Sequence, residues 1–259
     1  NVTAAANTAP AISNVVPPPT QTISEGSYLN VSFQFNATDA DGAGTLDNAT
    51  VRGFINKTGE TSRSNFSCTN IGNINSTTNR YNCTVDVWYF DGSGDWTVNV
   101  SIKDTSGVYA EDLSKTFAIG ATKGIAMDSG SVSWGSINLG DTNKIADNNI
   151  TLNNTGNVDI ASGNVNVTAY NLHGNTTASQ YIYAANFSAN INEACEGDVL
   201  GNATNTAVSS SILSAGNYSL IDGTGQERIA FCLERIANEG LNVQKYQSPG
   251  NYPWEIGVV

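Results

Sequence analysis

The stretch Asp95-Trp-Thr-Val-Asn-Val-Ser-Ile-Lys-Asp104 decides the fold of the first half of the chain, because apolar and polar residues alternate along it without a fault. Its apolar face consists of Trp96, Val98, Val100 and Ile102. A period of two over a stretch of this length is typical of a β-strand with one buried face. Turns rich in Asp and Gly lie on both sides, at residues 91–95 and 104–107. The sequence therefore predicts a strand that borders a hydrophobic core.

The same alternation recurs along the whole chain. Residues 28–38 place Leu29, Val31, Phe33 and Phe35 on one face. Further strands are predicted at residues 11–16, 49–55, 64–69, 80–90, 108–118, 148–153, 164–170, 180–188, 208–213 and 227–235 and at the C-terminus, with a long loop at 189–206. Residues 229–238 also fit a short helix, but we favour a strand around Cys232. Short strands at this spacing are typical of β-sandwiches, so the predicted fold class is all-β.

Two breaks in the pattern suggest the domain organisation. Residues 118–127 contain small side chains and two glycines between two alternating blocks. Pro17-Pro18-Pro19 imposes an extended segment that is poor in hydrogen bonds, and we expect it to detach the strand at 11–16 from the rest of the chain. We therefore predict an N-terminal extension (residues 1–19), a first sandwich (20–120) and a second sandwich (121–259).

Charge and composition exclude several classes of function. The 259 residues carry a net charge of −12 with 11 Lys and Arg in total, and none of these lies between Lys144 and Arg228. A protein that neutralises phosphates needs a clustered basic face, so nucleic acid is not an expected partner. The same argument disfavours an anionic membrane surface, and no apolar run is long enough to cross a bilayer, so membrane insertion of the mature chain is not expected. The chain begins at Asn1 without a signal segment, which we interpret as a processed secreted protein or a fragment of one.

Glycosylation acceptor patterns are the strongest compositional signal. The pattern Asn-x-Ser/Thr occurs 16 times, while random placement of the 34 Asn and 51 Ser plus Thr gives roughly 7 matches. We therefore predict covalent N-glycans and no other cofactor, with the acceptors on strands pointing away from the core. The predicted sites are Asn1, Asn30, Asn36, Asn48, Asn56, Asn65, Asn75, Asn82, Asn99, Asn149, Asn153, Asn166, Asn175, Asn186, Asn202 and Asn217.

Four cysteines, Cys68, Cys83, Cys195 and Cys232, complete the secretory pattern. No pair has the Cys-x-x-Cys spacing of a zinc or redox site. Four cysteines allow three pairings, and we favour Cys68–Cys83 with Cys195–Cys232 because each bridge then stays within one domain. Four buried free thiols are the alternative, and disulfides fit an extracellular chain better.

Calcium is the one candidate metal. Asp39 and Asp41 flank a turn, and Asp91, Asp95 and Asp104 lie in other turns. Calcium needs several converging oxygen ligands, whereas this spacing is not that of an EF-hand loop. Asp and Gly are also good turn formers, so structural turns are the favoured interpretation and no metal is assigned.

No motif predicts an enzyme. The single histidine, His173, lies in a polar stretch, and nothing around it suggests a catalytic triad, so we expect a surface loop residue. No zinc-protease, phosphate-loop or dinucleotide motif occurs. Paired carboxylates of the glycosidase type can form only in the fold. We predict no catalytic residues.

Several motifs carry a family resemblance. Asn7-Thr-Ala-Pro10, Asp39-Ala-Asp-Gly42 and the segments 89–96 and 103–107 resemble immunoglobulin-like repeats of archaeal and bacterial surface proteins over residues 7–119. Segments 134–140 and 152–156 are more loosely similar to β-sandwich domains of archaeal surface proteins and of biofilm matrix fibres. The resemblance implies two tandem immunoglobulin-like β-sandwich domains, and the dense acceptor patterns suggest an archaeal source.

The resemblance also implies a function, because such secreted subunits often polymerise by lending a terminal strand to a neighbour. We expect a structural subunit of an extracellular glycosylated filament or coat, a homopolymer of this chain, with Ile12, Val15 and Val16 as anchors of the donated strand. The C-terminal residues 254–258 alternate better but are expected to close their own domain. The alternative is a surface adhesin or carbohydrate-binding module, for which the outward aromatics Trp88 and Phe90 are the candidate contact surface, unless they pack under a loop.

Overall fold

The computed structural model describes residues 6–66, 68–220, 224–237 and 239–259. The fold is all-β, with two short 3-10 turns as the helical elements of the described residues. The chain divides into two compact units, Asn1–Thr122 and Lys123–Val259, and each is described by itself. None of the described helices is long and apolar enough to cross a membrane.

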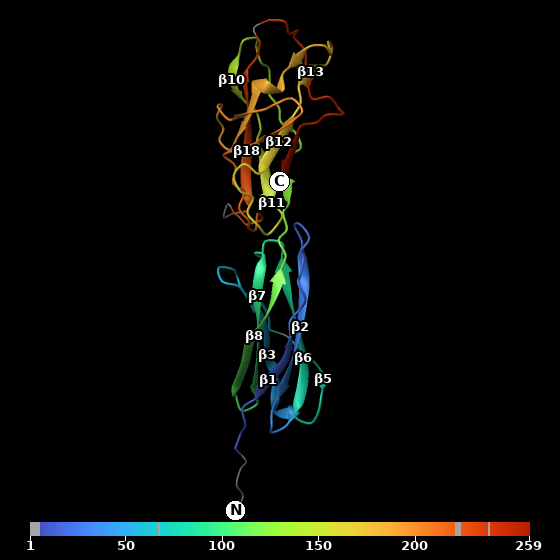
Figure 1. Cartoon of the computed structure of the whole chain (residues 1–259), viewed down its shortest axis with the longest axis vertical. Coiled ribbons are helices and arrows are strands. Elements are labelled where there is room, and N and C mark those ends of the chain that lie inside the picture. The colour runs from blue at the N-terminus through green and yellow to red at the C-terminus, as the bar shows by residue number, and fades with distance from the viewer. Residues whose placement is uncertain (1–5, 67, 221–223, 238) are drawn as a thin grey trace, which may run out of the picture. The chain divides into compact units, whose positions relative to one another are not determined.

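The first unit is sandwich-like and consists of two four-stranded antiparallel sheets (Figure 1). One sheet has the order β1 (Ala11–Val16), β2 (Tyr28–Thr38), β6 (Thr78–Trp88) and β5 (Thr69–Asn73). The other has the order β4 (Arg63–Asn65), β3 (Leu46–Asn56), β7 (Gly94–Asp104) and β8 (Tyr109–Ile119). A parallel bridge between Gln21 and Ile119 ties the segment after β1 to the second sheet.

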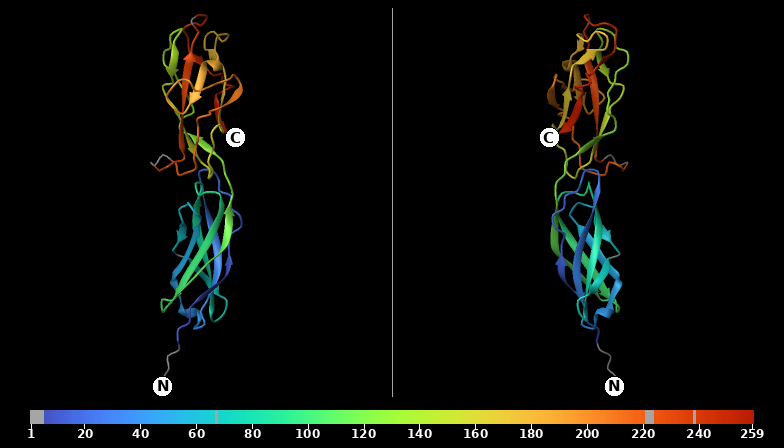
Figure 2. Two further views of the ribbon diagram at one scale, coloured as in Figure 1. Left: turned by 60° about the vertical axis from the view of Figure 1, so that its left-hand side comes forward. Right: turned by 90° about the vertical axis from the view of Figure 1, so that its right-hand side faces the viewer.

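The predicted core of the first unit is confirmed. The four apolar residues of β7 are fully buried, and so are the inward residues Val31, Phe33 and Phe35 of β2. The indole of Trp96 donates a hydrogen bond of 2.9 Å to the carbonyl of Gly92, so the largest core side chain also satisfies its polar atom. The alternation that defined these strands therefore buries their apolar faces in the core of this unit. Figure 2 shows the course of its strands in two further views.

The second unit has shorter strands. Its largest sheet has the order β16 (Asp198–Val199), β15 (Phe187–Asn190), β18 (Gln226–Arg235), β11 (Ile150–Asn154) and β9 (Ile125–Met127), and β10 (Thr142–Ile145) also pairs with β18. Two three-stranded sheets complete it: β17 (Thr204–Ala207), β12 (Val165–Ala169) and β20 (Glu255–Val258), and β14 (Tyr181–Ile182), β13 (Leu172–Gly174) and β19 (Tyr246–Gln247). The strand predicted around Cys232 is β18, and the C-terminal strand pairs with β12 inside its own unit.

Aromatic rings supply much of the second core. Trp254 packs against Phe187 at 5.2 Å and against Phe231 at 6.0 Å between ring centroids. Trp134 packs against Phe187 at 5.0 Å, and its indole donates to the carbonyl of Lys144. Trp134 lies in an irregular segment, so this unit depends on side chains outside its strands more than the first unit does.

Several predicted strands differ from the observed ones. The strand at 64–69 is two strands, β4 and β5, with Cys68 between them. The strand at 180–188 is broken by a 3-10 turn, Ala184–Asn186. The prediction of a strand at 208–213 is wrong: the strand forms at Thr204–Ala207, and beyond it Leu213 makes an isolated bridge with Ile160. Val208 and Leu213 are buried on either side of a turn. β9 lies inside the stretch that was predicted as a boundary.

Candidate functional site

The N-terminal strand β1 lies at the edge of its sheet. It pairs with β2 through Ala11↔Thr38, Ile12↔Ala37 and Ser13↔Asn36, and after an irregularity through Val16↔Gln34. Asn14 has a φ of 50°, which Asn tolerates better than most residues. Such a bulge leaves residues unpaired and bends the strand. β1 is therefore held by a short and interrupted ladder.

The predicted anchors contribute unequally. Val15 is the buried residue of β1, with 7% of its surface exposed, whereas Ile12 is half-buried and Val16 is 58% exposed. Val16 is therefore not an anchor while β1 lies in its own unit. An open groove of about 630 Å³ borders the strand, with Val15, Val16, Arg80 and Lys115 among its lining residues.

The expectation that Pro17–Pro19 detaches the N-terminal strand needs correction. Residues 11–16 form an antiparallel edge strand of the first unit. The segment after the prolines is also fixed, because the N–H of Gln21 donates to the carbonyl of Ala118 and the N–H of Gly120 to that of Gln21. The prolines thus connect two docked segments of one unit, and no β-strand covers residues 17–20.

The predicted glycosylation acceptors differ in accessibility. The exposed ones are Asn30, Asn48, Asn75, Asn175 and Asn202. The half-buried ones are Asn56, Asn65, Asn82, Asn99, Asn149, Asn153, Asn186 and Asn217. Asn1 lies outside the described residues. Exposed acceptors therefore occur in both units.

Two acceptors predicted to point outward are buried. Asn36 is 6% exposed and lies opposite Ser13 of β1, and Asn166 is 9% exposed. β12, which carries Asn166, is flanked by strands on both sides. The period of two placed these side chains off the main core but gave no sign of what covers them. A glycan on either one requires attachment before the unit closes.

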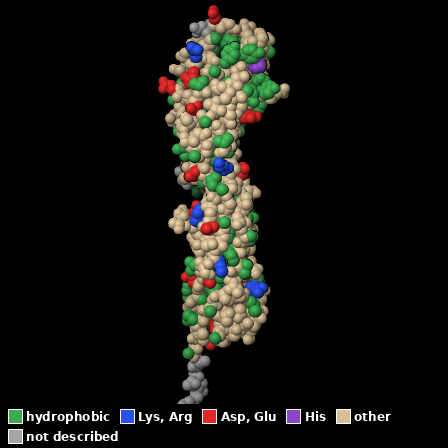
Figure 3. Space-filling model, in the orientation of Figure 1, with side chains coloured by type: hydrophobic (Ala, Val, Ile, Leu, Met, Phe, Trp, Pro, Cys, Tyr) green, Lys and Arg blue, Asp and Glu red, His purple; other side chains and the backbone are tan. Residues whose placement is uncertain are grey.

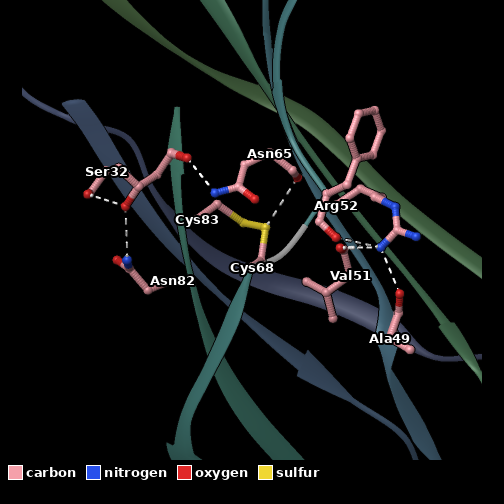
Figure 4. The surroundings of a disulfide bond; sticks show 10 residues. Ser32, Ala49, Val51, Arg52, Asn65, Cys68, Asn82 and Cys83 are labelled. Carbon is pink, nitrogen blue, oxygen red and sulfur yellow. Dashed lines mark hydrogen bonds between the residues drawn. A yellow bond between two sulfur atoms is a disulfide. The ribbon is translucent and has the colours of Figure 1, made fainter. Parts of the chain in front are cut away.

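Both predicted disulfides are confirmed, as Cys68–Cys83 and Cys195–Cys232. Figure 4 shows the first, with two predicted acceptors, Asn65 and Asn82, close to it. The amide of Asn65 donates to the carbonyl of Thr84 at 2.6 Å. The second disulfide ties the segment between β15 and β16 to the central strand β18. Two disulfides fit an oxidising environment such as the cell exterior.

The outward aromatics of the first unit form a small group. The rings of Trp88 and Phe90 are stacked at 6.1 Å with an interplanar angle of 13°, and Tyr28 lies 5.1 Å from Trp88. Trp88 is 38% exposed and Tyr28 is 53% exposed, whereas Phe90 is half-buried. The guanidinium of Arg63 lies 5.3 Å from the centre of the Phe90 ring and is bound to Asp91. Together these side chains form a partly exposed aromatic surface with one fixed cation.

The calcium candidates lie in different environments. Asp39 is fully buried and Asp41 is exposed, and the N–H of Asp41 donates to Oδ1 of Asp39 at 2.9 Å. Among the described residues, the set of three acidic, His or Cys side chains whose ligand atoms all lie within 4.8 Å of one another is Cys195, Cys232 and Glu234. Those two cysteines are joined in a disulfide and have no thiolate to offer a metal.

His173 is not the surface loop residue that was predicted. It lies on the short strand β13, opposite Tyr181 and Gln247, and it is half-buried. Its ring meets the Tyr181 ring edge to face at 4.6 Å. The imidazole therefore packs as part of the small sheet of β13, β14 and β19.

Lys and Arg side chains are scattered one by one over the face of the molecule shown in Figure 3.

No protein-family model matches the chain, and a search of curated proteins finds no match to it. The functional argument therefore depends on the geometry of the chain itself.

Proposed function

We propose that this chain is a structural subunit of an extracellular, glycosylated polymer, a filament or surface coat, in which β1 of one copy completes the first unit of the next. The polymer is a homopolymer. The proposal assigns no reaction to the chain and no metal to the assembly step, and its covalent groups are N-glycans on exposed acceptors.

The strand order supports an immunoglobulin-like assignment of the first unit. Constant-type immunoglobulin domains place strands A, B, E and D in one sheet and C, F and G in the other. Lettering β1 to β8 in chain order, with β4 as C′, gives sheets A-B-E-D and C′-C-F-G. The disulfide departs from that family, because it joins β6 to the segment before β5 rather than strands B and F. For the second unit we propose only a sandwich of related type.

β1 is held in its sheet by few contacts, and this is the observation that supports strand donation. A single buried side chain, Val15, anchors the strand, and full burial of a valine contributes about 1.5–3 kcal/mol. The ladder is interrupted at Asn14 and Val15. Leaving the sheet therefore costs little, and docking into a second copy restores the same contacts. Exchange of an identical element between copies is a low-cost route to assembly.

The polyproline segment suits a hinge. Residues 17–20 join β1 to Gln21, whose N–H donates a hydrogen bond to the carbonyl of Ala118. β1 can therefore leave its sheet while Gln21 keeps this hydrogen bond. Prolines hold such a segment extended, which limits the entropy that the released strand must lose again on docking.

Two observations support placing the polymer outside the cell. Both disulfides need an oxidising environment to persist. The excess of acceptor patterns, with exposed members in both units, is in keeping with glycosylation during secretion. The resemblance to archaeal surface proteins points the same way.

Deletion of residues 1–16 tests the proposal. The truncated chain is expected to keep both disulfides and its β-sheet circular dichroism, and to remain monomeric under conditions in which the full chain forms filaments in negative-stain electron microscopy. Filaments of the truncated chain would overturn strand donation by β1.

A second candidate function, carbohydrate binding in an adhesin, rests on the aromatic group of Tyr28, Trp88 and Phe90. Exposed rings can stack on the apolar faces of sugars, and Arg63 fixes a charge beside Phe90. A glycan array on the native protein distinguishes the two. Specific binding that is lost in Trp88→Ala, from a chain that forms no filaments, would favour the adhesin.

A further inference from the structure

Three distant segments meet at one end of the first unit. The side-chain amide of Asn7 donates to Oδ2 of Asp104 at 2.8 Å, and its carbonyl oxygen accepts from the hydroxyl of Ser106. The N–H of Thr8 donates to Oδ2 of Asp41 at 2.6 Å. The segment before β1 thus touches the β2–β3 loop and the β7–β8 loop at once.

Two carboxylates at this end are almost completely withdrawn from water. Asp39 is 0% exposed and Asp104 is 2% exposed. Oδ1 of Asp39 accepts from the N–H of Asp41, but its Oδ2 is buried and has no hydrogen-bond partner. Oδ1 of Asn79 is a second buried oxygen without a partner, and Asn79 comes two residues after Thr77, to whose carbonyl the N–H of Asp39 donates. Burying a carboxylate without a compensating charge is costly, and so is burying a polar atom without a hydrogen bond. The unpartnered oxygens of Asp39 and Asn79 therefore need an explanation.

The buried Asp91 of the same unit shows how a protein side chain can supply that compensation. Asp91 is 1% exposed, and the guanidinium of Arg63 binds both of its oxygens. The ion pairs of the described residues involve neither Asp39, Asp41 nor Asp104. A water molecule would satisfy an oxygen but would not balance the charge.

We propose that this end of the first unit binds a calcium ion, with Asp39, Asp104 and Asn7 as side-chain ligands. The ligand oxygens of Asp39, Asp41 and Asp104 do not all lie within 4.8 Å of one another, so we assign the two buried carboxylates as ligands. The exposed Asp41 then adds negative charge nearby without binding the ion. Rotation of the Asn7 amide by half a turn presents its oxygen where its nitrogen now meets Asp104, and amide orientation is interchangeable in this way. Backbone carbonyls and water complete the shell.

The donor set selects calcium among common cations. All its ligand atoms are oxygens, so the set lacks the nitrogen and sulfur ligands that zinc prefers. The ligands come from a loop, the end of a strand and the segment before β1, and they differ in reach, which suits the flexible six- to eight-fold coordination of calcium better than the strict octahedron of magnesium. Since the site lies in an extracellular-type module, a dissociation constant of roughly 10⁻⁴–10⁻³ M is expected.

The ion would fasten the segment that precedes β1. Asn7 is four residues from Ala11, where β1 begins, and its amide is the contact that reaches Asp104. Calcium binding therefore opposes departure of β1 from whichever copy it occupies. In the unassembled chain the site forms within one copy, so its test does not depend on the proposed strand donation.

Calcium titration of the chelator-treated, unassembled full chain tests the site. Isothermal calorimetry is expected to show one calcium ion per chain and much weaker magnesium binding, and hydrogen exchange of residues 6–16 should slow when calcium is added. Asp39→Asn and Asp104→Asn should each weaken binding at least roughly tenfold. Asp86→Asn, which changes an exposed carboxylate on β6, is the matched control and should bind as the parent does.

Folding of the variants is checked in the absence of metal. Asp39→Asn replaces an uncompensated buried charge with a neutral amide, so without calcium it should melt no lower than the chelated parent. Absence of calcium heat and of any change in exchange would overturn the proposal. So would folded Asp39→Asn and Asp104→Asn variants that bind calcium as tightly as the parent. The measurement does not involve filament formation, so calcium binding can be judged even if strand donation is wrong.

Discussion

At the scale of single residues, Gly53 shows how tightly the first core is closed. A Cβ at this position of β3 would lie 2.7 Å from Cβ and Sγ of Cys83 and 2.9 Å from Cζ of Phe33. Gly53→Ala is therefore expected to destabilise the first unit by about 1–3 kcal/mol, because the neighbours are a disulfide and a buried ring that cannot move aside. Urea unfolding measures the change, and Gly44→Ala, which meets no atom within 4 Å, serves as the control. Equal midpoints for the two variants would contradict this account of the core.

Asp141, directly before β10, has a pKa that its neighbours lower. The N–H of Asn138 donates to Asp141 and, with the nearby ammonium of Lys144, lowers the pKa of that carboxyl against the opposing effect of desolvation. A lowered pKa in the folded state means that the carboxylate stabilises the fold above its unfolded pKa of about 3.9, and that this contribution is lost as the pH falls through the folded value.

Asp141→Asn should therefore melt below the parent at pH 7, and the two curves should converge below about pH 4. Thermal melts across this range measure the difference, with Asp86→Asn as a surface control. A gap that persists unchanged in acid would show that Asp141 acts through something other than its charge.

At the scale of elements, alternation predicted strands well wherever one face meets a continuous core. Residues 28–38 form β2 with the predicted bounds, because every second side chain enters the same core. The prediction failed at 208–213, where Val208 and Leu213 are buried on either side of a turn and give the same apolar signal as a strand. It also failed at Asn36 and Asn166, because a period of two reports which face a side chain takes and not which neighbours cover it.

The candidate calcium ligands show the same limit of sequence analysis. Asp39 and Asp104 could be singled out as turn residues, but the sequence did not indicate Asn7, which lies 97 residues from Asp104 and meets it only when the strands pair. The disulfides were easier to predict, because keeping each bridge within one alternating block left a single favoured pairing.

The disulfides should stabilise their units to different extents. In the chain-entropy model, the separations of 15 and 37 residues correspond to about 3 and about 4 kcal/mol for Cys68–Cys83 and Cys195–Cys232. Replacing each pair by alanine should lower the unfolding free energy by these amounts, with the larger loss in the second unit, whose strands are shorter. Denaturant titration of the two double variants measures it. An unchanged midpoint after removal of Cys195–Cys232 would show that the loop before β16 is held by other contacts.

At the scale of the whole molecule, the accessible acceptors predict where mass is added. Protein from its native source should exceed the 27.2 kDa of the bare chain by several glycans. Glycopeptide mapping should find them on exposed asparagines such as Asn30, Asn48, Asn75, Asn175 and Asn202, and should find Asn36 and Asn166 bare. A native mass equal to that of the polypeptide would contradict the prediction that the chain carries N-glycans.

Strand donation is the central claim, and site-directed crosslinking tests it most directly. Ala11 of β1 and Thr38 of β2 lie opposite each other in the antiparallel ladder, so Ala11→Cys with Thr38→Cys brings two thiols within disulfide range wherever β1 docks. The double variant is assembled, mildly oxidised, and separated on a denaturing gel without reductant, with Ala11→Cys alone as the control. If β1 docks into a neighbour, the filaments yield a ladder of covalent dimers, trimers and longer chains. Filaments that yield only internally crosslinked monomers would contradict strand donation.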